Sequence, residues 1–425
     1  MKAVVISIGD EVLIGQVLNT NAAWLGEALN NAGINVEKNI VIRDQKEAIF
    51  KALNEARQLA SLVIITGGLG PTKDDITKES LSGYFNSQPV FSDEAYRHVV
   101  SFVKKRGLQM NDNNRRQAFV PENCTVIPNL IGTAPGMKFK QGNNLWYSLP
   151  GIPFEMKAMM EEHVLPELKS TFKLPPVIHK TIMTYGIPEA VLTEKLSDWE
   201  NNLPPEIKLA YLPSPRALRL RLSVYENAES AKPQLDDAII ALHKIIPDAI
   251  FSDEGKSLEE ALLNQLRRYK LSISTAESCT GGLIASLITT IPGASENYSG
   301  SVVAYQNSIK TKMLDVPVGV LEKAGAVSED TVRYMVKSAQ ERFGSDTAIA
   351  VSGIAGPDGG TKEKPVGTTW IAVAVKDKVI SRKYRFGSTR DVNIQKAAYS
   401  GMHMLYNLLT HREQLTIKST KYKFT

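Results

Sequence analysis

Apolar runs alternate with segments of helical periodicity in the first third of the chain. The runs have the length and β-branched content of buried strands, and they lie at residues 3–8, 35–42, 62–66 and 145–149. Between them, residues 20–32 and 46–60 carry apolar side chains at helical spacing. Strands that alternate with helices predict a parallel sheet with helices on both faces.

The pattern changes after Pro175-Pro176. Alternating segments predict strands at 177–185, 207–212 and 218–225, and helical spacing predicts helices at 189–199 and 231–246. This combination is typical of a small α+β module. The polar stretch 252–257 resembles a linker.

An α/β pattern returns in the last third of the chain. Helices are predicted at 258–269 and 283–290, and strands at 271–275, 302–305, 347–351 and 368–375. We therefore predict an α/β protein with two α/β sandwich domains, both with mostly parallel sheets, joined by the small α+β module. The predicted domains are residues 1–172, 173–252 and 257–415.

Composition narrows the class of protein. The 425 residues are 43% hydrophobic and 22% charged, which is typical of a globular chain, and a net charge of +5 is too small to indicate nucleic-acid binding. Cys124 and Cys279 give no disulfide framework, and no run reaches the ~18 apolar residues that a membrane span needs. Asp10 and Glu11 end the first apolar run too early for a signal peptide. We expect a cytoplasmic protein without a membrane or nucleic-acid partner.

The break at residues 276–282 is the first candidate site. Ser278 would follow a strand directly, at the sheet edge where α/β proteins bind ligands. Gly281 and Gly282 would let a ligand approach, and free backbone amides of residues 280–282 would stabilise a phosphate or an oxyanion. The alternative is that Ser278 and Thr280 only cap the next helix.

A serine nucleophile requires a base, and Lys310 is the available one. The histidines of this domain, His403 and His411, lie at its end, on or after the predicted final helix, so no Ser-His-Asp triad is indicated. Cys279 is a rival nucleophile, or else a small buried residue. Lys364 and Arg390 are candidate phosphate ligands, with solvated surface charges as the alternative.

A second candidate site follows the first three strands. Asp10 and Glu11 come after the first strand, Asp44 comes after the second, and a glycine-rich segment, residues 67–72, comes after the third. Such a segment suits phosphate oxygens, and the adjacent pair Asp74 and Asp75 suits a divalent cation that bridges phosphates. The alternative is that the pair favours the start of the next helix.

Five motifs of the last domain resemble those of the CinA (competence- and damage-inducible protein A) family. They are Ala276-Glu277-Ser278-Cys279-Thr280-Gly281-Gly282, Ile291-Pro292-Gly293-Ala294-Ser295, Gly325-Ala326-Val327-Ser328, Gly353-Ile354-Ala355-Gly356-Pro357 and Lys364-Pro365-Val366-Gly367-Thr368. The resemblance implies a nicotinamide mononucleotide deamidase, a Ser/Lys amidohydrolase that needs no cofactor. It implies catalytic roles for Ser278, Lys310 and Tyr305, and substrate binding by Thr280, Gly281, Gly282, Asn307, Ser352, Gly353, Lys364 and Arg390. The family often has threonine at position 352 and serine at position 306, where this chain has Ser352 and Gln306.

The first domain resembles the molybdopterin-binding-like domain of the same family, through the glycine-rich segment, Gly132-Thr133-Ala134-Pro135-Gly136 and Pro150-Gly151-Ile152-Pro153-Phe154-Glu155-Met156. In CinA proteins this domain is associated with cleavage of ADP-ribose to AMP and ribose 5-phosphate, which depends on a divalent metal (Mg²⁺ or Co²⁺) and is helped by potassium. The implied metal ligands are Asp74 and Asp75. The implied nucleotide-binding residues are Asp10, Glu11, Asn21, Asp44, Thr66, Gly67, Gly68, Gly70, Thr72, Pro150 and Gly151.

The middle segment resembles the KH-like domain of CinA proteins, but residues 175–250 contain no GxxG loop of the kind that clamps RNA. We expect it to serve packing or dimerisation, since the family is typically dimeric. Two other functions stay open. One is a non-catalytic nucleotide- or pterin-binding protein that acts in competence or the DNA-damage response through partners. The other is a molybdopterin-handling enzyme.

Overall fold

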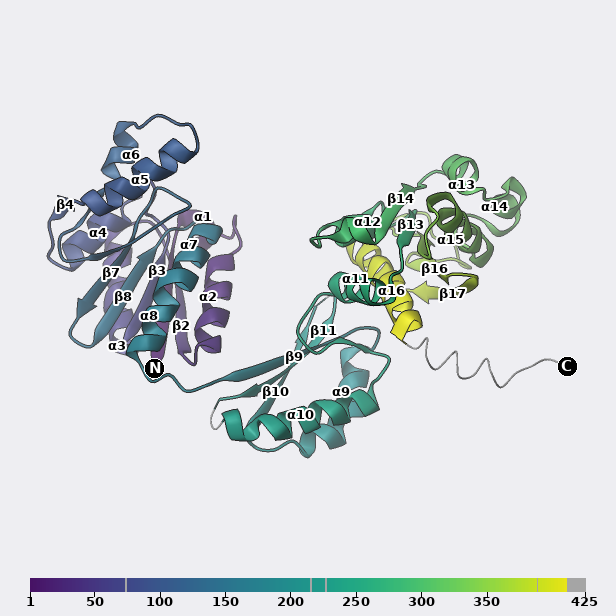
Figure 1. Ribbon diagram of the computed structural model, residues 1–425, viewed down its shortest axis with the longest axis horizontal. Coiled ribbons are helices and arrows are strands. Elements are labelled where there is room, and N and C mark those ends of the chain that lie inside the picture. The colour runs from purple at the N-terminus through teal and green to yellow at the C-terminus, as the bar shows by residue number, and fades with distance from the viewer. Residues whose placement is uncertain (73–74, 215, 226–227, 388, 411–425) are drawn as a thin grey trace. The chain divides into compact units, whose positions relative to one another are not determined.

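The computed structural model describes residues 1–72, 75–214, 216–225, 228–387 and 389–410. Its described residues form two compact units (Figure 1). The first comprises the described residues of Met1–Ile178 and Val224–Ser230, and the second comprises His179–Ser223 and the described residues from Ala231 onward. Each unit contains an α/β sheet with helices on both faces, as the sequence predicts.

The N-terminal unit is built on a six-stranded sheet of order β2-β1-β3-β8-β7-β6. Its strands are β1 (Lys2–Ile8), β2 (Asn35–Ile42), β3 (Leu62–Thr66), β6 (Thr125–Ile127), β7 (Gly136–Gln141) and β8 (Asn144–Leu149). Strands β2, β1, β3 and β8 are parallel, and β7 and β6 are added antiparallel at one edge. A short ribbon pairs β4 (Pro89–Phe91) with β5 (Phe119–Pro121).

Alternation along the central strands decides which helices cover which face. Ala3 and Val5 of β1 pack with one group of helices, whereas Val4 and Ile6 pack with the other. The first group is α2 (Thr20–Asn31), α7 (Pro153–Met159), the π-helix η1 (Met160–Val164) and α8 (Leu165–Thr171). The second is α3 (Lys46–Leu59) and α4 (Thr77–Tyr84). Three further helices, outside these groups, are α1 (Asp10–Leu13), α5 (Asp93–Lys105) and α6 (Asp112–Arg116).

The small α+β module forms a four-stranded sheet of order β10-β11-β9-β12. Its elements are β9 (Ile178–Thr184), α9 (Glu189–Asn201), β10 (Ile207–Pro213), β11 (Leu218–Val224), α10 (Ala228–Ile245) and β12 (Ile250–Ser252). Strand β12 was not predicted, because its three residues are too few to show alternation, and it forms only by pairing antiparallel with β9. The predicted linker at 252–257 therefore begins within a strand.

The C-terminal sheet has the order β14-β13-β15-β16-β17. Its strands are β13 (Ile273–Glu277), β14 (Tyr298–Val303), β15 (Thr347–Gly353), β16 (Thr368–Val375) and β17 (Lys378–Arg385). Strands β14, β13 and β15 are parallel, and β16 and β17 are antiparallel additions. The strand predicted at 302–305 begins earlier, at Tyr298, because its small and polar residues gave no apolar run.

Large and small side chains alternate along β15 and β16, and this sets the two faces of the C-terminal sheet. Large residues such as Ile349 and Ile371 face α11 (Leu258–Tyr269), α12 (Leu283–Thr289) and α16 (Arg390–Thr410). Alanines, among them Ala348 and Ala350, face α15 (Glu329–Phe343), and their small side chains let that helix approach the sheet closely. The remaining helices are η2 (Ala294–Glu296), α13 (Asn307–Leu314) and α14 (Val318–Ala324).

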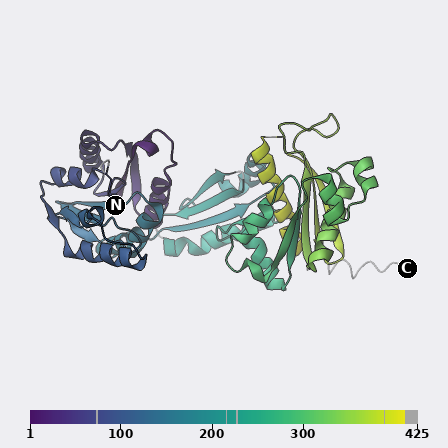
Figure 2. The ribbon, with the colours of Figure 1, turned by 90° about the horizontal axis from the view of Figure 1, so that it is seen from above.

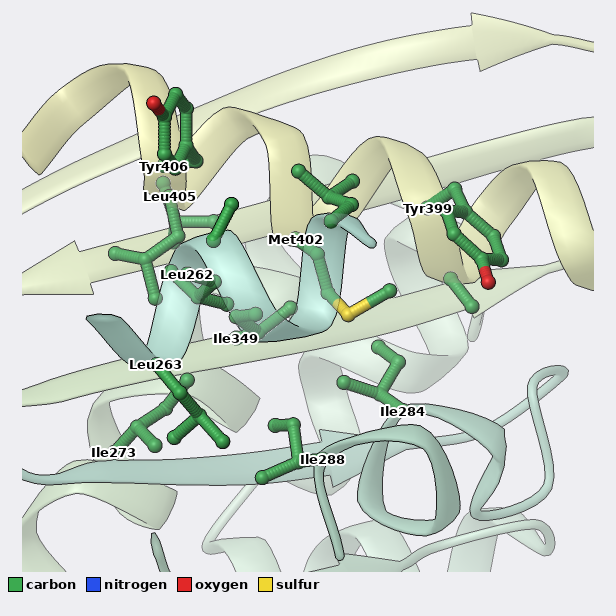
Figure 3. Close-up of a cluster of buried hydrophobic side chains, with 14 of the residues drawn as sticks. Leu262, Leu263, Ile273, Ile284, Ile288, Ile349, Tyr399, Met402, Leu405 and Tyr406 are labelled. Carbon is green, nitrogen blue, oxygen red and sulfur yellow. The ribbon is translucent and has the colours of Figure 1, made fainter. Parts of the chain in front are cut away.

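Helix α16 is the centre of the larger apolar cluster. Figures 1 and 2 show it in yellow along one face of the C-terminal sheet, and Figure 3 shows its residues Met402 and Leu405 among side chains from α11 and the strands. Residues 411–415 of the predicted last domain lie outside the described residues. Within the described part of the chain, every helix is too short or too polar to cross a membrane.

Candidate functional site

The turn between β13 and α12, residues 278–282, lies at the carboxyl edge of the parallel strands. The amide of Ser278 donates to the carbonyl of Val351 on the neighbouring strand, at 3.0 Å, and this bond holds the turn against β15. Gly281 and Gly282 have φ angles of +61° and +96°, in the left-handed region that glycine tolerates best. The two glycines therefore shape the backbone that presents Ser278.

Glu277, the last residue of β13, has a fully buried carboxylate at the start of α12. It accepts hydrogen bonds from three backbone amides, at 3.0 Å from Gly282, 3.1 Å from Ile284 and 2.8 Å from Ala285. A carboxylate at this position interacts favourably with the positive end of the helix. Glu277 thus joins the strand to the helix across the turn.

The free amides expected at residues 280–282 are only partly present. The amide of Gly281 donates to the carbonyl of Ser278 at 3.1 Å, and that of Gly282 donates to Glu277. That expectation is wrong for these two amides, because the turn and Glu277 already use them. Thr280 differs, since its side-chain Oγ1 is buried without a hydrogen-bond partner. A buried hydroxyl without a partner is costly and indicates a place for a ligand atom.

Lys310 is buried, with 1% of its surface exposed. Its Nζ donates to the carbonyls of Ala304 and Tyr305, at 2.8 and 3.1 Å. The amide of Ala304 in turn donates to the carbonyl of Glu277 at 2.8 Å, so the Lys310 amine is linked through one residue to the start of the turn. Burial lowers the pKa of Lys310, and the nearby Cys279 opposes this only in part.

Cys279 is buried beside Gly353, where a side chain at that glycine would begin 3.0 Å from the cysteine Sγ. Burial raises the pKa of the Cys279 thiol to about 12. A thiol with this pKa stays protonated near neutral pH, and the protonated form is a poor nucleophile. The environment therefore supports a packing role for Cys279.

Tyr305 and Arg390 meet at the same edge, although they are far apart in the sequence. Arg390 donates from Nη2 to the Tyr305 hydroxyl at 2.8 Å, and from Nη1 to the carbonyl of Gly356 at 2.6 Å. Tyr305 is 57% exposed, so the pair lies at the surface of the site. These two partners hold the arginine in place. Because both are neutral, they do not balance its positive charge.

Other predicted residues lie around the loop that follows α14. Ser352 donates to the carbonyl of Ala326 at 2.7 Å, and the Lys364 ammonium donates to the carbonyl of Ala324 at 2.7 Å. Lys364 thus binds the carbonyl of the last residue of α14 and is not a fully solvated charge. Asn307 begins α13 and is exposed, and no interaction joins its side chain to the other predicted residues within the described part of the chain.

The N-terminal glycine loop follows β3 and is closely packed. A side chain at Gly67 would begin 2.1 Å from the carbonyl oxygen of Ile8, and one at Gly68 would begin 2.1 Å from Thr77 Oγ1. Both glycines have positive φ angles, +110° and +65°. Only glycine fits these two positions, which explains the glycine-rich sequence.

A polar network closes the loop against the end of β8. Asn21 donates from Nδ2 to Thr66 Oγ1 at 3.0 Å and to the carbonyl of Gly151 at 2.7 Å, while Thr66 donates to the carbonyl of Pro150 at 2.8 Å. The Asn21 Oδ1 atom is buried without a partner. The structure therefore brings these four predicted residues together and leaves one acceptor for a ligand.

The predicted carboxylates do not all lie beside the glycine loop. Asp75 accepts hydrogen bonds from the amide and the hydroxyl of Thr72, and its carboxylate lies against Gly70. The carboxylate of Asp44 lies beside Gly68, whereas Asp10 and Glu11 are exposed on α1. Asp74 lies outside the described residues. Among the residues that are described, no group of three histidine, cysteine, aspartate or glutamate side chains could hold a metal.

Two residues near the glycine loop were not predicted from the sequence. Thr77 is fully buried, and its Oγ1 has no hydrogen-bond partner. Lys78 donates to the carbonyl and the side-chain oxygen of Gln117, at 2.8 and 3.0 Å, and burial lowers its pKa to about 8. Both lie within three residues after Asp75, so a motif extended to residue 78 would have included them.

Three family models match consecutive parts of the chain. Residues 4–170 match the probable molybdopterin binding domain, residues 179–252 match the damage-inducible protein CinA KH domain, and residues 255–409 match the CinA C-terminal domain. The three matches follow the order of the two α/β sheets and the small module between them in the sequence.

Relatives of known sequence are similar over almost the whole chain. A CinA-like protein of Cytophaga hutchinsonii is 43% identical over 94% of this chain and 96% of its own length. A CinA-like protein of Flavobacterium psychrophilum is 41% identical over 96% of this chain and 98% of its own length. Among solved structures, the competence/damage inducible protein CihA of Agrobacterium tumefaciens is 37% identical, with a TM-score of 0.35, over 36% of this chain and 93% of that one.

Proposed function

Because this chain belongs to the CinA family, we propose that its C-terminal domain hydrolyses the carboxamide of nicotinamide mononucleotide, giving nicotinate mononucleotide and ammonia. The observation that carries the proposal is Lys310. Its amine is buried beside the Ser278 turn and donates to two main-chain carbonyls, with no salt bridge to a carboxylate within the described part of the chain. A buried lysine without a salt bridge is costly, and such groups are concentrated at functional sites.

In the proposed mechanism, Lys310 in its neutral form takes the proton of the Ser278 hydroxyl. The Ser278 Oγ then attacks the carboxamide carbon, and the C–N bond breaks as Lys310 returns the proton to the departing ammonia. Water hydrolyses the resulting ester, with Lys310 again acting as the base. Lys310 and Ser278 are not hydrogen-bonded to each other in the described residues, and catalytic hydrogen bonds often tighten only when substrate binds.

Thr280 is the residue that best suits the oxyanion. Its Oγ1 is buried and lacks a partner, whereas the amides of Gly281 and Gly282 are already used within the turn. Hydrogen-bond donors fixed before the reaction stabilise the developing charge effectively. Arg390 is held by Tyr305 and Gly356 and is the cation proposed to bind the substrate phosphate, with Lys364 as a second cation.

The N-terminal domain is proposed to cleave ADP-ribose to AMP and ribose 5-phosphate. The observation that favours this second activity is the pair of buried oxygens without partners, Asn21 Oδ1 and Thr77 Oγ1, beside a glycine loop suited to phosphate. Asp75, with Asp74, is proposed to hold a divalent cation, which would neutralise phosphate charge, and potassium is proposed to assist. A pterin ligand is the alternative for this site, and a binding protein without either activity is the alternative for the chain.

The first prediction separates the two adjacent nucleophile candidates. Ser278→Ala should reduce the rate of ammonia release from nicotinamide mononucleotide by at least about 10³-fold, because the attacking oxygen is lost. Cys279→Ala is the matched control and should keep most of the activity, since its thiol stays protonated. Ammonia is measured by a coupled assay on the full chain. If activity survives in Ser278→Ala and disappears in Cys279→Ala, the nucleophile is Cys279 and not Ser278.

The second prediction concerns pH. Lys310 must be neutral to act as a base, so kcat/KM for ammonia release should rise with pH as Lys310 loses its proton. Because burial lowers its pKa, this rise should lie below the ordinary lysine value of 10.5. Lys310→Met should abolish ammonia release, while Lys312→Met, an exposed lysine on the same helix, should keep both the rate and the pH profile. An active Lys310→Met enzyme with the same profile contradicts the assignment.

The third prediction tests the N-terminal site. Thr77→Val keeps the shape of the side chain but removes the buried hydroxyl, and it should lower AMP formation from ADP-ribose by about tenfold or more. Thr125→Val, at an exposed position, should have no effect. A chelator should stop AMP formation, and Mg²⁺ or Co²⁺ should restore it, while ammonia release stays unchanged. Full AMP formation by Thr77→Val would refute the role of Thr77. Full AMP formation by the parent chain in the presence of the chelator would refute the metal requirement.

A further inference from the structure

A cavity of about 830 Å³ lies between the small α+β module and the C-terminal domain, both within the second compact unit. Its walls come from the segment between β9 and α9, the turn between β10 and β11, strand β17 and helix α16. Neither Ser278 nor Lys310 lines it. Its volume is within the range of about 300–1,000 Å³ that is usual for small-molecule sites.

The two domains that form the cavity are held together by direct contacts. The Tyr185 hydroxyl of the small module donates to the carbonyl of Lys396 at 3.1 Å, and Asn407 donates to the carbonyl of Asp248 at 2.9 Å. Met183 and Phe251 of the module belong to the same apolar cluster as α16. Packed elements of both domains therefore form the walls of the cavity.

Aromatic rings cover part of the wall. Tyr384 and Phe386, at the end of β17, are stacked, with their ring centroids 5.5 Å apart and an interplanar angle of 18°. Tyr185 adds a third ring, whose centroid lies 5.2 Å from that of His403. Flat aromatic surfaces of this kind favour a planar ring in the ligand.

His403 supplies a polar group in this apolar wall. Its Nε2 is buried and has no hydrogen-bond partner. Burial lowers the pKa of His403 to about 4, so the ring is neutral near neutral pH and has no charge to be balanced. A buried ring nitrogen without a partner is costly, and a hydrogen-bonding group on a planar ligand would satisfy it.

Four charged side chains line the same cavity, the cations Arg382 and Lys396 and the carboxylates Glu189 and Asp248. No salt bridge joins Arg382, Lys396 or Glu189 to another residue that the structure describes. Cations of this kind bind phosphate, and carboxylates accept hydrogen bonds from ribose hydroxyls. A purely apolar ligand would match neither the cations Arg382 and Lys396 nor the buried ring nitrogen of His403.

We propose that this cavity binds a nucleoside monophosphate whose base carries an amino or amide group. The base packs against Tyr384 and Phe386 and forms a hydrogen bond with His403, while Arg382 and Lys396 bind the phosphate. The site is separate from the two sites already described, and it does not depend on the activity proposed for either.

Calorimetric titration of the full chain tests the proposal, with AMP and nicotinamide mononucleotide as the probes, and every protein in the experiment carries Ser278→Ala so that the second probe is not hydrolysed. The parent chain should show one binding event that Arg382→Ala and Lys396→Met each weaken by about tenfold or more, because a charge-assisted hydrogen bond is lost. Arg385→Ala is the matched control, since this arginine is exposed on the same strand and does not line the cavity. It should bind both probes as the parent does. The probe that loses affinity in the variants identifies the base.

Nucleotide binding in this cavity can be distinguished from nucleotide binding at the other two sites. Events at the N-terminal site and at the Ser278 site should persist in Arg382→Ala and Lys396→Met, because neither residue belongs to those sites. Thermal unfolding of each variant without ligand verifies that it is folded. If folded Arg382→Ala and Lys396→Met bind both probes with the parent's affinity and stoichiometry, the cavity does not bind nucleotide and the proposal is overturned.

Discussion

The hydrogen bonds of the Glu277 carboxylate hold the C-terminal site together. This buried side chain ends β13 and accepts three amides at the start of α12, so strand, turn and helix are fixed to one another around Ser278. Hydrogen bonds to a charged group contribute about 1.5–3 kcal/mol each when both partners are removed from water. One of these bonds occupies the Gly282 amide, which the sequence had predicted to be free for an oxyanion. Thr280, whose hydroxyl lacks a hydrogen-bond partner, is therefore the donor of this turn that we propose for the oxyanion.

Both α/β sheets place their candidate chemistry at the carboxyl edge of parallel strands. In the N-terminal sheet, the glycine loop after β3 packs against the carbonyl of Ile8 at the end of β1. In the C-terminal sheet, the Ser278 turn is bonded to β15, and the chain after β14 returns Lys310 to it. The apolar alternation of the strands buries both faces of each sheet, which leaves this edge as the place where polar side chains gather.

The sequence predicted the fold well where its signals were local. The strand at 62–66 and the helix at 258–269 have the predicted bounds, because four continuous apolar residues and a regular apolar spacing are unambiguous. Strand β12 was missed, since three residues depend on a distant partner for their structure.

At the candidate sites, the motifs indicated which segments to consider but could not show which hydrogen-bonding groups were already occupied. The role of Glu277 and the free hydroxyl of Thr77 depend on contacts between elements, which no spacing rule contains. The assigned roles of Ser278, Lys310 and the metal-binding pair remain predictions. The cavity lined by His403 also needed the structure, because its walls come from two domains, residues 184–249 and residues 373–408.

The central claim is that the Ser278 oxygen becomes covalently bonded to the substrate. It is tested most directly by rapid acid quenching of the enzyme during turnover of nicotinamide mononucleotide, followed by peptide mass spectrometry. The account predicts an adduct on Ser278 with the mass of nicotinamide mononucleotide less ammonia. An adduct on Cys279 would contradict it. So would turnover without any adduct under conditions in which single-turnover kinetics show that an intermediate accumulates.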